Sequence, residues 1–486
     1  MSVRFWRQHY FGWTLWLVIG LATPGLGCAR FRPAPLVPTR TAAAFESRRL
    51  DSLDLKTFLE ANLHHSLPNW PVREWDLETL TLVAFYYHPD LEMARAHMAV
   101  AEAGVITAGG RPNPSIGFTP EAIANATAGI SPWTLGFTFD VPIETMGKRG
   151  YRIRRAKQLT EAARLELAET AWRVRSRLRT TLMEHFLAQR ELDLLRAEAS
   201  LRAETLTSLD RRYGVGQASL QALTAARTDL ANTQRAVEAA AGRLAESQVA
   251  LASALGLPVS ALDGVKLSWP ALDQPPTEAT LPPELIQREG LLNRLDVRRA
   301  LAEYAAAEAA LQLEIAKQYP DIHLGPGYSW DQGDNKFALG LSVTLPLFNQ
   351  NQGPIAEAEA HRKEAAARFV ALQAHVIGEL DQALARYRAA LAELAEANHA
   401  VLELHELQLQ RTQPWAAAAT DPLVLTEWLT QRAVVTQARL EALHKTQAAL
   451  GALEDAVQHP LDETRTATSP PPKAGVGVTP VTASER

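Results

Sequence analysis

The chain contains the same long pattern twice. The segment around Asp90 returns around Asp296, a separation of 206 positions (296 − 90). Residues 135–142 return as residues 339–346, at an offset of 204 positions (346 − 142). A repeat of this length indicates a duplicated structural unit rather than a short solenoid module. The function must therefore be sought in what two similar halves build together.

Composition favours long, packed helices. Hydrophobic residues make up 47% of the chain and aromatic residues only 7%, and Ala and Leu supply most of the apolar content. Alanine-rich sequence with spaced leucines and many charges is typical of long helices packed against each other. The net charge of −5, without a basic block, gives no support for a nucleic-acid partner.

The first 28 residues have the pattern of an export signal. Arg4 and Arg7 precede an apolar run over residues 11–21, and small residues lead to Cys28, the only cysteine. The run is shorter than the roughly 20 residues of a membrane span, and one cysteine excludes an intrachain disulfide. We expect residues 1–27 to be a lipoprotein-type signal peptide and Cys28 to be acylated, with Ala29 favouring the outer membrane. The alternative is an ordinary signal peptide with an incidental cysteine. We expect no cofactor other than this covalent lipid.

Both copies predict the same order of elements. A helix is followed by two strands around a polar loop, then by one very long helix and a shorter one. In the first copy these elements lie at residues 89–109, 115–143, 151–212 and 218–255. In the second copy they lie at residues 295–318, 321–347, 353–413 and 423–457. A helix of about 62 residues is about 93 Å long.

The domain division follows from this order. Residues 28–75 are expected to be an extended segment with one short helix near residues 53–61, and Asp76 is expected to cap the helix that follows. The predicted parts are the segment 28–75, repeat 1 at 76–257, a Pro-rich linker at 258–283, repeat 2 at 284–457 and a disordered tail at 458–486.

The helix lengths imply a rod in each copy. The two shorter helices together have about 60 residues, close to the length of the long helix, so they can stack end to end beside it. Four strands cannot close a membrane barrel, because known membrane barrels have at least about eight. Open sheet edges are not tolerated in lipid, so we expect several chains to combine. The sequence alone does not choose between two chains and three.

Over residues 76–457 the chain resembles TolC-type outer-membrane channel proteins. The tandem copies carry the resemblance, together with Pro112-Asn113-Pro114 before the first hairpin and residues 344–348 after the second. The resemblance implies a mainly α fold with a β-barrel: a homotrimer with a twelve-stranded membrane barrel and a long α-helical barrel. It also implies a lipid-anchored protein of the bacterial outer membrane that extends into the periplasm. The implied partners are a periplasmic adaptor (membrane fusion protein) and an inner-membrane pump of the RND type.

The resemblance assigns roles to several segments. The turn between the long and short helices of repeat 1 resembles the family's adaptor-docking tip, and capping of the second helix by Ser219 is the structural alternative. The tip residues are Arg212, Tyr213, Gly214, Val215, Gly216 and Ser219. At the second tip, Thr420 and Asp421 are candidates for a periplasmic gate or for a helix cap. Strand–helix junctions are predicted at Pro114, Pro142, Pro320 and Pro346 and at Gly147, Lys148 and Arg149.

The Gly147-Lys148-Arg149 segment resembles one found in the heavy-metal (cobalt–zinc–cadmium) efflux branch of the family, and the alternative is a basic turn that opens a helix. The 13 histidines are scattered without the spacing of metal ligands. We assign no metal, catalytic or cofactor-binding residue and expect no enzyme activity, because phosphate loops, nucleophile elbows and paired cysteines are missing from the sequence.

The sequence therefore predicts a passive outer-membrane duct of a tripartite efflux system that exports small solutes, with heavy-metal ions among the candidates. Two alternatives remain. One is the outer-membrane duct of type I protein secretion. The other is a periplasmic adaptor, which would carry one hairpin nested between two halves of a small β-domain, so the tandem repeat speaks against it.

Overall fold

A computed structural model describes residues 30–125, 129–278, 281–415 and 422–461. The chain divides into two units, Met1–Arg48 and Arg49–Arg486. The described part of the first unit carries helix α2 (Pro38–Glu46), in a segment predicted to be extended. That prediction was wrong because Pro38 at the first helical position and the alanines after it favour helix initiation.

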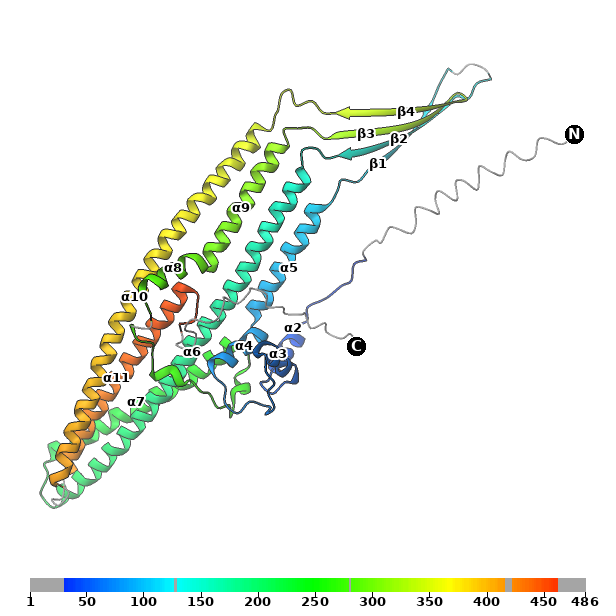
Figure 1. Cartoon of the computed structure of the whole chain (residues 1–486). Helices are drawn as coiled ribbons and strands as arrows, with labels where there is room; N and C mark the ends of the chain where they lie inside the picture. Colours follow the sequence, from blue (N-terminus) through cyan, green and yellow to red (C-terminus); the bar gives the residue numbers. More distant parts are fainter. Residues whose placement is uncertain (1–29, 126–128, 279–280, 416–421, 462–486) are drawn as a thin grey trace. The chain divides into compact units, whose positions relative to one another are not determined.

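The second unit is built on parallel tracks of helices. Figure 1 shows α5, α6, α9 and α10 running side by side toward the sheet, and the neighbours in contact are α5 with α6, α6 with α9, and α9 with α10. Beyond them α7 also contacts α6, while α11 contacts both α6 and α10. The helices are α5 (Pro89–Gly109), α6 (Lys148–Gly214), α7 (Leu220–Leu255), α9 (Leu295–Ala316), α10 (Gln352–Trp415) and α11 (Pro422–Val457).

The shorter helices meet end to end, as the sequence predicts. Gly256 caps the C-terminus of α7 in the left-handed conformation, with φ of 72°. A Cβ atom on Gly256 would lie only 2.8 Å from the carbonyl oxygen of Tyr87, next to the start of α5. In the second copy, the backbone N–H of Leu295 at the start of α9 donates to Gln458 Oε1, 2.7 Å away, just after α11. Each long helix is thus flanked by a stacked pair.

The four strands form one antiparallel sheet in the order β1-β2-β3-β4. They are β1 (Ser115–Ala122), β2 (Trp133–Ile143), β3 (Ile322–Asp331) and β4 (Asp334–Val343). Both predicted hairpins are confirmed, but the second turn is tighter than predicted. Gln332 and Gly333 alone connect the strands, with φ of 51° and 110°, as a two-residue hairpin turn requires. Strand β4 begins at Asp334 and ends at Val343, before the predicted end of the second hairpin at residue 347.

Short helices and the linker cover the middle of the long helices. They are α3 (Leu53–Leu63), α4 (Leu77–Tyr87), η1 (Val259–Leu262), η2 (Pro270–Asp273) and α8 (Pro283–Asn293). Asp76 caps α4, as predicted, by accepting from Thr79 N at 2.8 Å. The linker is packed rather than free: the backbone N–H of Trp75 donates to Lys266 O, and Leu272 is fully buried.

Buried charges join the two repeats. Arg179 on α6 is 4% exposed, and its guanidinium lies 3.3 Å from a carboxylate oxygen of Glu454 on α11. The same guanidinium donates to the backbone oxygen of Gln447 at 2.9 Å and lies over the ring of Trp269 in the linker. A buried charge is tolerated only when its donors and acceptors are paired, so this network specifies how α6 and α11 pack.

Candidate functional site

One face of the sheet is apolar across all four strands. The register places Ile116 opposite Phe139, Val141 opposite Leu324, and that leucine opposite Leu341. Other aliphatic and aromatic members of this face include Phe118, Leu135, Phe137, Ile143, Ile322, Tyr328, Trp330, Phe337, Leu339 and Val343. Several of these side chains are strongly exposed, including Leu339 at 80%. An exposed apolar surface of this extent marks a site of contact with lipid or protein.

The opposite face is small and polar. Alternation places Thr138, Ser342 and several glycines there, with charged residues toward both ends of the strands. At one end His323 lies 3.0 Å from Asp140 on the neighbouring strand, and at the other Lys336 pairs with Asp331 at 2.6 Å. Apolar residues on one face and small polar residues on the other are the pattern of transmembrane barrel strands.

Both edges of the sheet lack a partner strand within the described residues, since β1 pairs only with β2 and β4 only with β3. The strands have 8 to 11 residues, and ten residues extend over about 33 Å. Tilted by about 45°, such strands match the roughly 25 Å apolar band of a membrane barrel.

The first turn of α6 anchors the sheet to the helices of both repeats. Gly147 precedes α6 in the left-handed conformation, and Lys148 begins the helix with only 7% of its surface exposed. The Lys148 ammonium donates to Tyr319 O at 2.6 Å and to Asp321 Oδ1 at 2.7 Å. Thr145 N also donates to Asp321 Oδ1, at 3.0 Å. Lys148 therefore ties the start of α6 to the chain between α9 and β3.

Two arginines of the same turn bind the end of α5. Arg149 Nε donates to Gly109 O at 2.7 Å, and Arg152 donates to Gly110 O at 3.2 Å. Arg152 also forms an ion pair with Glu144. The last carbonyls of a helix have no intrahelical donor, and cations there also interact favourably with the helix dipole. The basic turn thus supplies donors where a helix gives way to a strand.

The predicted junction residues lie at this level of the molecule. Pro114 directly precedes β1, Pro320 lies two residues before β3, and Pro346 follows the end of β4. Pro142 departs from the prediction, because it is the penultimate residue of β2 and pairs with His323 of β3. The sequence did not reveal the acceptors of the basic turn, because Asp321 is 173 positions from Lys148.

The tip of repeat 1 has the predicted turn. Helix α6 ends at Gly214, and Gly216 adopts a φ of 77°, which glycine tolerates best. Ser219 Oγ accepts from Ala222 N at 3.1 Å and so caps α7. Tyr213 and Val215 are exposed by 42% and 70%. Arg212 lies in the last turn of α6, and its backbone carbonyl accepts a hydrogen bond from the N–H of Gln217.

Three other residues with predicted roles, Thr420, Asp421 and Cys28, lie outside the residues that the structure describes.

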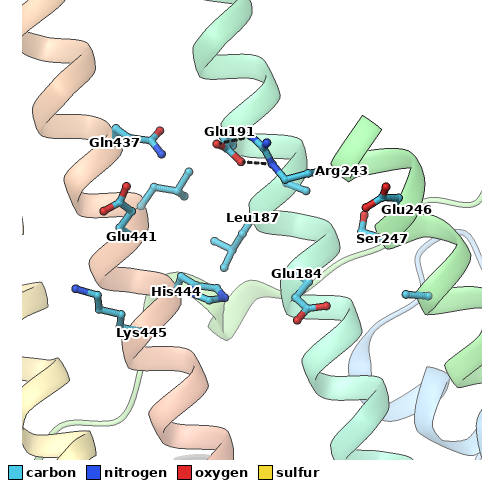
Figure 2. A pocket seen from close by; sticks show the side chains of 13 residues that line it. Glu184, Leu187, Glu191, Arg243, Glu246, Ser247, Gln437, Glu441, His444 and Lys445 are labelled. Atoms are coloured by element: carbon cyan, nitrogen blue, oxygen red, sulfur yellow. Dashed lines mark hydrogen bonds and ion pairs between the residues drawn. The ribbon is translucent and has the colours of Figure 1, made fainter. Parts of the chain in front are cut away.

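A groove of about 660 Å³ lies between α6, α7 and α11 nearer the tip. Figure 2 shows acidic side chains from all three helices around it: Glu184, Glu191, Glu246 and Glu441. Glu191 pairs with Arg243 at 2.8 Å.

Within the described ranges, no group of three or more His, Cys, Asp or Glu side chains lies close enough together to hold a metal ion. Of the helices that the structure describes, none is long and apolar enough to cross a membrane.

Comparison with known proteins shows a family match over part of the chain. The family model described as outer membrane efflux protein matches residues 84–257, which hold α5, the first hairpin, α6 and α7. Over residues 84–257 the chain is similar to outer membrane efflux proteins. This match confirms the resemblance stated from the sequence.

Two curated relatives are similar over part of their length. The cobalt-zinc-cadmium resistance protein CzcC of Cupriavidus metallidurans is 27% identical over 284 residues, which are 58% of this chain and 65% of the relative. The pyoverdine export outer membrane protein OpmQ of Pseudomonas aeruginosa is 22% identical over 312 residues, covering 58% of this chain and 64% of the relative. The matched region thus spans about two thirds of each relative.

Solved structures show the same fold. The outer membrane protein VceC of Vibrio cholerae matches with a TM-score of 0.63 and 18% identity, over 79% of this chain and 97% of VceC. The channel protein CusC matches with a TM-score of 0.62 and 17% identity, over 89% of this chain and all of CusC. The predicted fold, mainly helical with one small antiparallel sheet from two tandem copies, is confirmed.

Proposed function

We propose that this protein is the outer-membrane channel of a tripartite efflux system. Three chains would place their sheets edge to edge and close a twelve-stranded barrel, above a tube of long helices. The channel is passive, since a partner pump supplies the energy and a periplasmic adaptor connects the two. The match to outer membrane efflux proteins supports this function, and so do the resistance role of CzcC and the export role of OpmQ.

The sheet is the observation that carries the proposal. Its apolar face spans all four strands, its other face is small and polar, and β1 and β4 are open edges. In lipid, each unpaired backbone N–H or C=O costs several kcal/mol, so a sheet must close on itself or on copies. Four strands are too few to close alone, which favours an oligomer of this chain.

Heavy-metal ions are the first cargo to test. The relative CzcC is named for resistance to cobalt, zinc and cadmium, and the Gly147-Lys148-Arg149 segment resembles that branch. The same three residues serve the helix–strand junction here, so they argue for membership of the branch and not for direct contact with a metal. The similarity to OpmQ, a pyoverdine export protein, makes a pyoverdine-type cargo the second candidate, whereas no observation specifically favours protein secretion.

A lipid anchor on Cys28 and a location in the outer membrane belong to the same proposal. The support is the sequence pattern before Cys28 and the similarity to OpmQ, an outer membrane protein. Labelling cells with radioactive palmitate tests the anchor: the wild-type chain should incorporate label and the Cys28→Ser variant should not. Equal labelling of the two chains would exclude Cys28 as the acylated residue.

Oligomeric state tests the duct itself. Native mass spectrometry of the detergent-solubilised protein should give three times the mass of the processed chain, and planar bilayers should show ohmic channels. Expression with its cognate pump and adaptor in a host without its own channel should raise resistance to cobalt, zinc or cadmium. A monomer that remains soluble without detergent would rule out the proposal.

A further inference from the structure

A second concavity lies where α11 ends and α9 begins, about 610 Å³ in volume. It is lined by α6, α10 and α11, by Gln458 just after α11, and by Arg294 and Asp296 at the start of α9. Two stacked helices leave a gap in side-chain cover at their junction, which explains why a hollow forms here. Four arginines and four carboxylates line it: Arg173, Arg177, Arg294, Arg386, Glu169, Asp296, Glu379 and Asp455.

Two of the carboxylates are satisfied by Arg294 at the junction. Its Nε lies 3.0 Å from both carboxylate oxygens of Asp296, and its Nη2 lies 2.7 Å from Glu379 Oε2. His375 Nε2 lies 3.0 Å from the other oxygen of Glu379. Arg294 is buried and also donates to Ala456 O. This part of the lining is therefore closed to a ligand.

The other two carboxylates also have partners, Glu169 in an ion pair and Asp455 in two hydrogen bonds. Glu169 Oε2 lies 3.2 Å from Arg299 Nε. Asp455 accepts from Trp172 Nε1 at 2.9 Å and from Ser176 Oγ at 2.6 Å. None of the four carboxylates thus depends on the remaining arginines of the hollow for a partner.

Three arginines are left with most of their donors unused. Arg173 donates to Thr170 Oγ1 at 2.9 Å. For Arg177 and Arg386, the described part of the chain provides no hydrogen bond or ion pair. All three are exposed. Each guanidinium carries five N–H donors in a planar fork that fits the oxygens of carboxylate or phosphate.

These arginines lie on the face of the helices opposite the linker. On the same two helices, Arg179 of α6 lies over Trp269 of the linker, and Arg388 of α10 pairs with Glu278 of the linker at 2.8 Å. Arg177 lies two residues before Arg179 on α6, and Arg386 lies two residues before Arg388 on α10. Two residues correspond to a rotation of about 200° around the helix axis. Arg173 is one turn from Arg177 and shares its face. If the linker lies outside the tube, the three arginines line its interior.

We infer that this hollow binds a multivalent oxyanion, a polycarboxylate or a phosphate, on the inner wall of the duct. The inference rests on the proposed function for its location, and on the three guanidinium groups for its chemistry. A trimer would present nine such groups at one level. The four carboxylates of the hollow have other partners, so the three guanidinium groups are the donors left for an incoming anion. Anionic chelates of a metal would therefore be admitted here more readily than the bare dication.

Isothermal titration calorimetry on the detergent-solubilised full chain tests the site without requiring a pore. Citrate and inorganic phosphate are the probes, and they distinguish a polycarboxylate site from a phosphate site; monovalent acetate is the charge control. The variant is the triple substitution Arg173→Gln, Arg177→Gln and Arg386→Gln. Arg388→Gln is the control for loss of an arginine outside the hollow. It removes one positive charge two residues from Arg386, from an exposed ion pair that contributes little to stability.

We expect the wild type and the Arg388→Gln variant to bind at least one of the two probes within about twofold of each other. The triple variant should bind it about tenfold more weakly or worse, as loss of charge-assisted hydrogen bonds predicts. Binding should also weaken at 1 M salt, where the Debye length is about 3 Å. Equal binding by the triple variant and wild type, or binding of neither probe by the wild type, overturns the inference.

Bilayer recordings separate this inference from the proposed function. In a KCl gradient, the reversal potential of the triple variant should shift toward cation preference relative to wild type and Arg388→Gln. Failure of every chain to form channels counts against the proposed function, and calorimetry then still decides the site. Channels with unchanged selectivity in the triple variant count against the anion site and leave the duct intact.

Discussion

Replacement of Gly256 by alanine tests the end-to-end junction of α7 and α5. Gly256 has a φ of 72°, a conformation that L-residues with a Cβ adopt at a cost of about 1–2 kcal/mol. The added Cβ would also lie 2.8 Å from Tyr87 O and 3.0 Å from His88 Cα. These are backbone atoms, so they cannot move aside by rotating a side chain.

Two costs therefore add at this position. Overpacking of a well-packed site typically costs about 1–3 kcal/mol, so Gly256→Ala should lower the free energy of unfolding by about 2–5 kcal/mol. Gly264→Ala is the matched control. It has the same φ of 72°, but a Cβ there would have nothing within 4 Å. The control should lose only the conformational part, about 1–2 kcal/mol.

Urea-induced loss of the helical circular dichroism signal, recorded in detergent, measures both variants against the wild type. The informative quantity is the difference between the two variants, because the left-handed backbone cost is common to both. We expect Gly256→Ala to be the less stable by at least about 1 kcal/mol. Equal midpoints and slopes for the two variants would show that α7 and α5 do not abut as described.

Two further substitutions test other parts of the structure. Lys148→Met should lower the free energy of unfolding by about 2–3 kcal/mol in the same assay. Breaking a fully buried ion pair typically costs about 3–5 kcal/mol, and the loss here is smaller because the Asp321 side chain is 34% exposed. Lys157 is exposed, so the control Lys157→Met should change the free energy of unfolding by less than about 0.5 kcal/mol. Equal losses of stability in the Lys148→Met and Lys157→Met variants would contradict the anchoring role of Lys148. Burial lowers the pKa of His185 below its ordinary value of about 6.5. Its folded form resists protonation, so stability should fall as the pH drops below about 6.5 toward the folded pKa. His185→Gln should flatten that part of a thermal-stability profile between pH 7 and pH 5, and an unchanged slope would refute the assignment.

Local features of the chain were sufficient to predict the elements. Gly256 and Pro258 end one helix, and the residues from 151 to 212 lack Pro and Gly, so α6 could be read as one long helix. Strand alternation identified the hairpins because side chains in a strand change face at every residue. The tandem offset of about 206 residues then related the two halves before any contact was known.

Contacts between residues distant in sequence were beyond such reasoning. Helix α2 was missed in the segment predicted to be extended. The sequence identified a Pro-rich linker but not that Leu272 within it is fully buried. Nor did it reveal that the charged residues Arg179 and Glu454 are only 4% and 1% exposed. A helical pattern shows which residues share a face, but not which face meets another helix.

The sequence by itself determined the repeat, the lengths of the helices and the alternation of the strands, because these depend on residues a few positions apart. Only the tertiary structure decided that Lys148 meets Asp321 and that the carboxylates beside Arg177 and Arg386 are satisfied by other donors. Those facts depend on which helices lie side by side. An arginine looks the same in a sequence whether its guanidinium is paired or free, and the difference arises only when distant segments pack together.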